Sequence, residues 1–336
     1  MKKMLLWTML LLALLLPARA EGAALPPFDC GDGEPMMAAV CDYLLKELGA
    51  GFEPADAAIP FATILETDDA DPGDVRVWGL FGLFNYTLRN TTLMEESGCV
   101  VSGLLHLRTA DGAYEVTYAE WAEEGEGSRE DEERIFGARP GLLEQLDAAT
   151  EDLGTAQLQS VSDYVNRNSL PVTQYQSFGW APVELINAPE TPEAEQIIHY
   201  ESPLGYAVDY DLRRFSYIEY GDGEEGLAGV EALEGIGVDV TRREEAAEAA
   251  VEALSADLEQ PVAEAATFGA DAVPATWVRD GALRPEVDRS AYVVALPEGG
   301  CLVFAVNNTY YAVEGDPVVG GGDAALAEVL ATIRLL

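Results

Sequence analysis

The longest apolar pattern in the chain runs from residue 74 to residue 88 and reads DVRVWGLFGLFNYTL. Alternate side chains of an extended strand point to opposite faces, and here both sets of alternate positions are apolar. One set is Val75, Val77, Phe81 and Leu83; the other is Trp78, Leu80, Phe84, Tyr86 and Leu88. Both faces therefore need cover, and we expect a long, bent strand with helices on its concave side and partial cover on the other. Gly79 and Gly82 are expected to mark a bulge or a sharp bend.

Other patterns place elements around this strand. Apolar residues at three- and four-residue spacing predict helices near residues 35–48, 142–153 and 158–165. Alternating runs bounded by turn residues predict strands at Ile59–Glu66, Val100–Arg108 and Tyr114–Trp121.

A second half follows residues 186–199, whose spaced prolines and glutamates predict a semi-rigid linker. Beyond it, alternation predicts a strand pair and then four strands near residues 262–268, 275–279, 291–296 and 301–306. A capping box predicts a helix that begins at Thr241, and Asp323 is expected to cap a last helix. The predicted class is α+β in two domains. Residues 30–185 would form a curved antiparallel sheet with packed helices, and residues 200–336 an α/β layer sandwich with an antiparallel sheet.

Residues 1–20 have the pattern of a signal peptide. Lys2 and Lys3 precede an apolar run over residues 5–16, and Ala18-Arg19-Ala20 is a small-x-small cleavage site. We expect cleavage after Ala20 and export, either into the medium or to the extracellular face of the cell envelope. The apolar run is short for a bilayer span. A retained anchor is therefore the less favoured alternative, and we expect no membrane insertion after cleavage.

The chain is strongly acidic, with 60 Asp and Glu residues against 19 Lys and Arg. The signal peptide holds three of the basic residues, so its removal would leave a net charge of 16 − 60 = −44. This field repels nucleic acid, which we exclude as a partner. With 49% hydrophobic residues the chain can build cores, so it is not an acidic disordered tail. The acidity indicates a solvated surface or, alternatively, a surface for cations or cationic partners.

Four cysteines, Cys30, Cys41, Cys99 and Cys301, occur in a chain expected to be exported, where disulfides can form. Their spacing does not decide among the three complete pairings. Cys41 lies on an apolar helix stripe and Cys99 follows the aromatic strand, so we predict a Cys41–Cys99 disulfide. Four free, buried thiols are the alternative, and no spacing suggests zinc.

Recognisable catalytic and cofactor motifs are absent. The stretch from Gly221 to Gly226 matches GxGxxG, but its acidic residues would repel a pyrophosphate, so we interpret it as a hairpin turn. The aspartates of residues 68–74 fail the EF-hand pattern and are interpreted as a turn between strands. We predict no catalytic residue, no cofactor and no metal site. The candidate ligand-binding residues are Trp78, Phe81, Phe84, Tyr86 and His106.

Three segments of the sequence resemble those of an uncharacterised family of exported proteins from gut Firmicutes: AVCDYLLKELG, IPFATILETDDADPGDVRVWGLFGLFNYTL and DYVNRNSLPVTQYQSFGW. The resemblance covers roughly residues 36–185. Helix first, then a meander with a long central strand, is similar to the cone-shaped nuclear transport factor 2-like fold. Residues 200–336, with YESPLGYAVDYD and LAEVLATIRLL, resemble the PsbP and DcrB type of domain. These resemblances imply an accessory or binding module in the second half, and leave the function of the first open.

The main hypothesis is an exported, non-enzymatic protein that binds a small-molecule ligand or a protein partner of unknown identity. The alternative is a small-molecule enzyme that uses His106 or an interior acid such as Glu66 inside the first domain. A calcium-dependent adhesive module is a third hypothesis. The rings of Trp78, Phe81, Phe84 and Tyr86 discriminate between a filled and an open first domain, and we expect a filled one.

Overall fold

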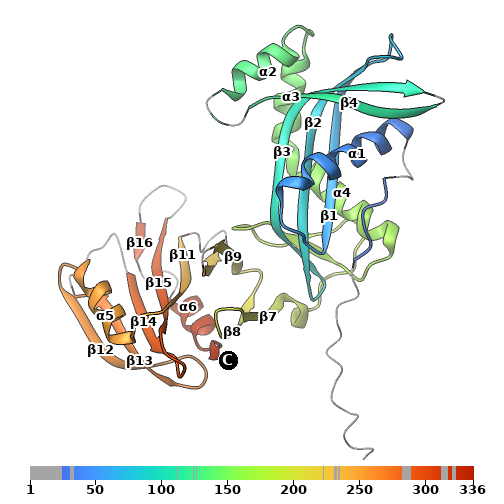
Figure 1. Ribbon diagram of the computed structural model, residues 1–336. Helices are drawn as coiled ribbons and strands as arrows, with labels where there is room; N and C mark the ends of the chain where they lie inside the picture. The colour runs from blue at the N-terminus through green and yellow to red at the C-terminus, as the bar shows by residue number, and fades with distance from the viewer. Residues whose placement is uncertain are drawn as a thin grey trace, which may run out of the picture.

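The protein is described by a computed structural model with α+β architecture (Figure 1). The described residues are 25–30, 34–110, 112–123, 125, 127–221, 223–230, 233, 235–281, 289–311, 317–319 and 323–336. The predicted signal peptide, residues 1–20, lies outside them. We call residues 25–184 the N-terminal half and residues 193–336 the C-terminal half, because separate sheets are built from each.

The N-terminal half is built on a six-stranded sheet in which β3 is the longest strand. Its strands are β1 (Ala57–Asp68), β2 (Val75–Arg89), β3 (Thr92–Ala110), β4 (Ala113–Trp121), β5 (Gln174–Gln176) and β6 (Val183–Glu184). The end of β3 pairs with β4, whereas its start pairs in parallel with β5. The helices are α1 (Pro35–Glu47), α2 (Ser128–Phe136), α3 (Leu142–Glu151) and α4 (Leu153–Asn168), and a short 3₁₀ turn, η1 (Gly49–Gly51), follows α1.

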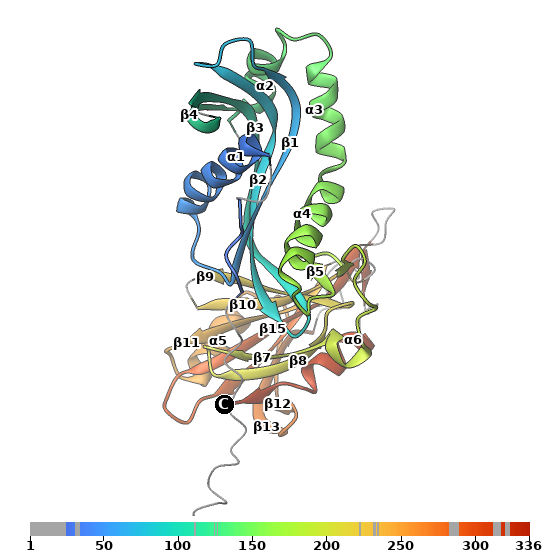
Figure 2. The same ribbon diagram turned by 90° about the vertical axis from the view of Figure 1, so that its right-hand side faces the viewer.

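Both faces of β2 are covered, as the alternating pattern predicts. Val75, Val77 and Phe81 pack with α1 on one face. Trp78, Leu80, Phe84 and Tyr86 pack with side chains of α2, α3 and α4 on the other. Figure 2 shows the sheet between α1 on one side and α3 and α4 on the other.

Of the two glycines of β2, Gly79 lies at a bulge: it pairs with Ile64 where the β1–β2 register shifts, and the extra residue, Leu65, belongs to β1. No register shift occurs at Gly82, so the prediction is wrong for that glycine. Against β3, the register of β2 is continuous through both glycines, and the nearest irregularity lies at Asn85–Tyr86. Glycine is required because neighbouring groups occupy the space of a side chain. A Cβ at Gly79 would lie 2.6 Å from the Thr63 carbonyl oxygen, and one at Gly82 would overlap the Phe61 ring.

The described residues of the C-terminal half form two sheets, with helices on either side of the larger one. The larger sheet contains β9 (Phe215–Gly221), β10 (Glu224–Gly229), β11 (Ile236–Arg243), β12 (Pro261–Phe268), β13 (Val273–Asp280), β14 (Arg289–Ala295), β15 (Cys301–Tyr311) and β16 (Pro317–Val319). The smaller one contains β7 (Ile197–Ser202), β8 (Tyr206–Asp211) and β17 (Arg334–Leu335). Helix α5 (Ala247–Ala256) covers one face of the larger sheet, whereas the smaller sheet and α6 (Asp323–Leu330) pack on the other.

The helix predicted to begin at Thr241 begins later, at Ala247. Thr241 instead belongs to β11 and pairs with both Glu224 and Val303. Residues Ile236 to Val240 alternate inward and outward, and this strand pattern continues through Thr241, so sheet pairing prevails over the local capping pattern. The GxGxxG stretch joins β9 and β10, which pair antiparallel, as expected for a hairpin.

The segment between the halves, predicted as a semi-rigid linker, is held by buried polar contacts. The Gln174 amide donates to the Gln196 side-chain oxygen at 3.1 Å, and Thr191 contacts Thr173 through hydroxyls 2.7 Å apart. A short 3₁₀ turn, η2 (Glu193–Gln196), leads into β7. The Gln176 amide also reaches across to the Leu212 carbonyl at 2.8 Å. These contacts fix the two halves against each other.

Cys41 carries a free thiol, so the predicted Cys41–Cys99 disulfide is wrong. Cys41 instead lines a pocket of about 430 Å³ together with Cys30. Burial raises the pKa of Cys41 to about 11, and Cys30 adds to that rise. Cys301 is buried, whereas the other three are partly buried.

Candidate functional site

The four aromatic candidates of β2 form part of the core. Phe81 and Tyr86 are 0% exposed, Trp78 is 4% and Phe84 is 8%. The Trp78 indole donates to the Ile135 carbonyl at 3.1 Å, and the Tyr86 hydroxyl accepts from the Gln157 amide at 2.9 Å. Their rings fill the space on the two faces of the sheet, in line with the expectation of a filled first domain. A ligand would have to displace packed side chains to reach them.

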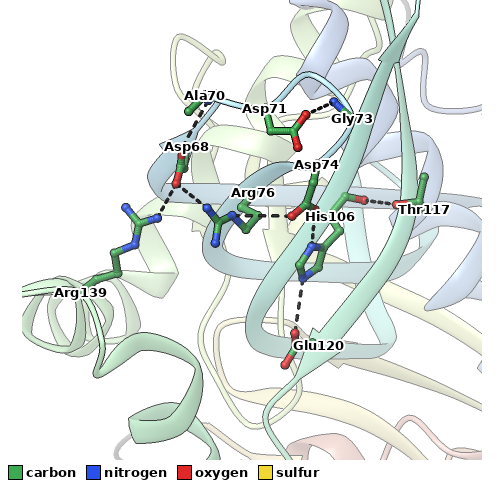
Figure 3. A network of polar contacts seen from close by, with 10 residues as sticks. All are labelled: Asp68, Ala70, Asp71, Gly73, Asp74, Arg76, His106, Thr117, Glu120 and Arg139. Atoms are coloured by element: carbon green, nitrogen blue, oxygen red, sulfur yellow. Dashed lines mark hydrogen bonds and ion pairs between the residues drawn. The ribbon is translucent and has the colours of Figure 1, made fainter.

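His106 is on β3, and its ring lies between the carboxylates of Asp74 and Glu120 (Figure 3). Its Nδ1 atom is 2.6 Å from Asp74 Oδ1, and its Nε2 atom is 3.4 Å from Glu120 Oε1. The Thr117 hydroxyl donates to the backbone oxygen of His106 rather than contacting the ring. Both ring nitrogens are therefore engaged with acids, and the arrangement suits a clamp between loop and strand better than a general base.

A chain of ion pairs extends from this histidine to the alternative base, Glu66. Asp74 lies 3.9 Å from Arg76 Nε, and Asp68 receives hydrogen bonds from Arg76 at 2.8 Å and Arg139 at 2.7 Å. Arg139 also pairs with Glu66 and stacks 4.2 Å from the Trp78 ring centroid. The Arg139 hydrogen bond is the main cause that lowers the pKa of Asp68. Glu66 is thus occupied by a cation and separated from His106 by this network.

Three aspartates of residues 68–74 make polar contacts within the protein. Asp71 accepts a hydrogen bond from the Gly73 backbone at 2.9 Å, while Asp68 and Asp74 face the cations described above. Within the described ranges, no group of three or more His, Cys, Asp or Glu side chains is arranged to hold a metal ion.

The larger candidate site is a cleft of about 800 Å³ between the two halves. The N-terminal half contributes the η1–β1 loop, the end of β2 and the start of β3; the C-terminal half contributes β7 and β9. Five aromatic side chains line it: Phe52, Phe178, Tyr200, Tyr217 and Tyr220. Its volume lies in the range of small-molecule sites. We refer to it below as the interhalf cleft.

A β-bulge places two acids in the interhalf cleft. Tyr86 pairs with Glu95 and Asn85 with Ser97, so Glu96 is an extra residue on β3. Such bulges re-aim side chains, and both glutamates line the cleft. Desolvation is the main cause that raises the pKa of each carboxyl. For Glu96, the facing Glu219 of the other half raises the pKa further, whereas Arg89 lowers it.

Neutral donors hold the more buried of these acids. Glu95 Oε2 accepts hydrogen bonds from Gln157 at 2.8 Å and from Ser177 at 2.6 Å. In the described part of the chain, Glu95, Glu96 and Glu219 form no salt bridge. Arg89, which lines the same cleft, acts on Glu96 only through its charge and lowers the pKa of that carboxyl.

The wall of the C-terminal half is a braced tyrosine pair. The hydroxyls of Tyr200 and Tyr217 lie 2.8 Å apart, and they donate to Glu225 Oε2 at 3.2 Å and 3.0 Å. Glu225 is 2% exposed, so the bracing carboxylate lies behind the wall. Burial is the main cause that raises the pKa of Tyr200 to about 12. The hydrogen bonds to Glu225 thus hold both rings in a fixed orientation. The Tyr200 hydroxyl is protonated at neutral pH.

Sequence reasoning missed this site because its residues come from both halves. The bulge at Glu96 depends on the register of β3 against β2, which residue patterns do not give. Tyr200, Tyr217 and Tyr220 lie in stretches correctly predicted as strands. The signal that the sequence offered for them was a concentration of tyrosine in YESPLGYAVDYDLRRFSYIEYGDG.

Comparisons with known proteins found no matching family model, no matching curated protein and no matching solved structure. Among the described residues, no helix has the length and apolarity needed to cross a membrane.

Proposed function

We propose that this protein is an exported, non-enzymatic binding protein of the bacterial envelope or extracellular space, and that it binds its ligand in the interhalf cleft. The observation that carries the proposal is the cleft itself, with five aromatic side chains around about 800 Å³. Phe178 and Tyr220 are 42% and 52% exposed, and aromatic groups of this kind are common anchors for ligands.

The polar joint between the halves supports the same function. Gln176 is 1% exposed and reaches Leu212, and the Gly179 amide donates to the Ser216 hydroxyl at 2.8 Å. Asn90, at the tip of the β2–β3 hairpin, donates to the Ile197 carbonyl at 3.0 Å. A cleft held open by such contacts is preorganised, which reduces the entropic cost of binding.

A thermal-shift screen of neutral, cationic and anionic small molecules tests the cleft as a binding site. A ligand that raises the melting temperature should lose about tenfold or more in affinity with Phe178→Ala or Tyr220→Ala, because each removes an aromatic wall. Trp180→Ala is the matched control, since Trp180 is 68% exposed and does not line the cleft. Equal affinity of all three variants would place binding elsewhere and contradict the proposal.

One observation favours an enzyme as the second candidate. Desolvation raises the pKa of Glu95, and raised carboxyl pKa values suit a general acid. Turnover of a broad panel of hydrolase substrates, abolished by Glu95→Gln, would support this alternative and contradict the non-enzymatic function.

A further inference from the structure

The interhalf cleft has an excess of negative charge. Four glutamates line it, Glu53, Glu95, Glu96 and Glu219, together with one cation, Arg89. Glu96 and Glu219 come from different halves, and the charge of Glu219 raises the pKa of Glu96. The fold therefore holds like charges together across the cleft, at a cost in free energy that a bound cation would offset.

The aromatic side chains complement this charge. Ring faces attract cations, most strongly where water is partly excluded. Arg89 demonstrates this within the cleft, because its guanidinium carbon lies 6.0 Å from the centroid of the Tyr200 ring. Phe178 and Tyr220 are exposed and available for the same contact. Aromatic faces combined with carboxylates favour an alkylammonium group over a hydrated inorganic ion, because the rings also cover its methylene groups.

Hydrogen bonds hold several of the side chains that line the cleft in position. Glu225 holds the hydroxyls of Tyr200 and Tyr217 behind the rings, which keeps their apolar faces in position. Gln157 and Ser177 hold the Glu95 carboxylate in the same way. The Glu95 carboxyl group and the rings of Tyr200 and Tyr217 are thus fixed before a ligand arrives.

We propose that the interhalf cleft binds an aliphatic amine carrying more than one positive charge, with its ammonium groups against Glu96 and Glu219 and its methylene chain against the aromatic side chains. This inference rests on the proposed function, since it names the ligand class of the same cleft. An anionic or neutral ligand would leave the facing carboxylates uncompensated.

Isothermal titration calorimetry with spermidine as the probe tests the inference on the chain lacking residues 1–20. We expect saturable binding, and about tenfold weaker affinity for each of Glu96→Gln and Glu219→Gln. Glu151→Gln, an exposed change on α3, is the control for a general loss of negative charge and should leave the affinity unchanged. Triacetylated spermidine, which keeps the methylene chain but lacks the charges, should not bind.

Three results would overturn the amine assignment. Equal binding of triacetylated spermidine would show that charge is not recognised, and equal weakening by Glu151→Gln would show only non-specific attraction to an acidic surface. Displacement of spermidine by equimolar calcium chloride would show a metal-ion site. If spermidine fails but a neutral ligand binds with dependence on Phe178 and Tyr220, the amine assignment falls while the proposed function stands.

Discussion

Single residues in the interhalf cleft are held in states that cost stability. Glu95 is withdrawn from water and bonded by neutral donors, and desolvation raises its pKa above the ordinary value of 4.5. The folded state therefore binds this proton more tightly than the unfolded state. The protonated carboxyl therefore contributes stability. This contribution is fully present below the pKa of Glu95 in the unfolded state, and it is lost as pH rises through the pKa of Glu95 in the folded state.

Because ionisation of Glu95 costs stability in the folded state, a change to a side chain that cannot ionise gives a prediction, Glu95→Gln. The glutamine keeps an acceptor oxygen for Gln157 and Ser177 but cannot ionise, so the variant should melt about 2 °C or more above the parent near pH 7. The difference should shrink towards zero near pH 4, where the parent carboxyl is protonated. Differential scanning calorimetry across this pH range measures it, with Glu151→Gln as control. A destabilised variant near pH 7 would contradict desolvation as the dominant cause.

Gly82 gives a second prediction at this scale. An added Cβ would overlap the Phe61 ring and lie 2.9 Å from the Cys99 carbonyl oxygen. Gly82→Ala should therefore lower the free energy of unfolding by about 1–3 kcal/mol, the usual cost of overpacking. Gly154→Ala is the control: nothing lies within 4 Å of its Cβ in α4, and the change should be neutral or stabilise by about 0.5 kcal/mol. Chemical denaturation of both variants compares these outcomes, and equal stability would contradict the packing argument.

Among the elements, those with strong periodic patterns were the ones predictable from sequence. The two faces of β2 followed from alternation, and the stripe of α1 from three- and four-residue spacing, because burial dictates residue type at each position. The start of α5 was mistaken since the capping pattern at Thr241 is local, whereas pairing with Val303 is not. The Glu96 bulge, and with it the candidate site, depends on strand register and on contact between the halves. No local pattern encodes either.

The segment before α1 is docked on α4 and provides a test at the scale of an element. The Tyr164 hydroxyl donates to the Pro26 carbonyl at 2.6 Å, and the Phe28 ring stacks on Tyr164 with centroids 6.2 Å apart. Tyr164→Phe keeps the stacking but loses the hydrogen bond, which should weaken docking by about 1 kcal/mol. Thermolysin should then cleave near Leu25 and Phe28 several times faster. Thermolysin should cleave the control variant Tyr118→Phe at the parental rate, because Tyr118 is exposed. An unchanged cleavage rate in Tyr164→Phe would show that docking does not need this hydrogen bond.

Over the whole molecule, a ligand site between the two halves requires that the halves act as one body. Gln176 bonds the Leu212 carbonyl and the Trp180 carbonyl, both at 2.8 Å. Gln176→Ala removes the donor to the buried Leu212 carbonyl, at a cost of about 1–3 kcal/mol. Calorimetry should show one cooperative transition for the parent and two for this variant, with exposed Gln159→Ala resembling the parent. Two transitions in the parent would contradict a fixed joint.

The most direct test of the interhalf cleft as the ligand site is amide hydrogen exchange with and without saturating spermidine. We expect slower exchange in residues 51–55, 87–97 and 217–221, segments of both halves that contribute residues to the cleft lining. Exchange around the smaller pocket lined by Cys30 and Cys41 should not change. Protection confined to one half, or centred on that smaller pocket, would contradict a site between the halves.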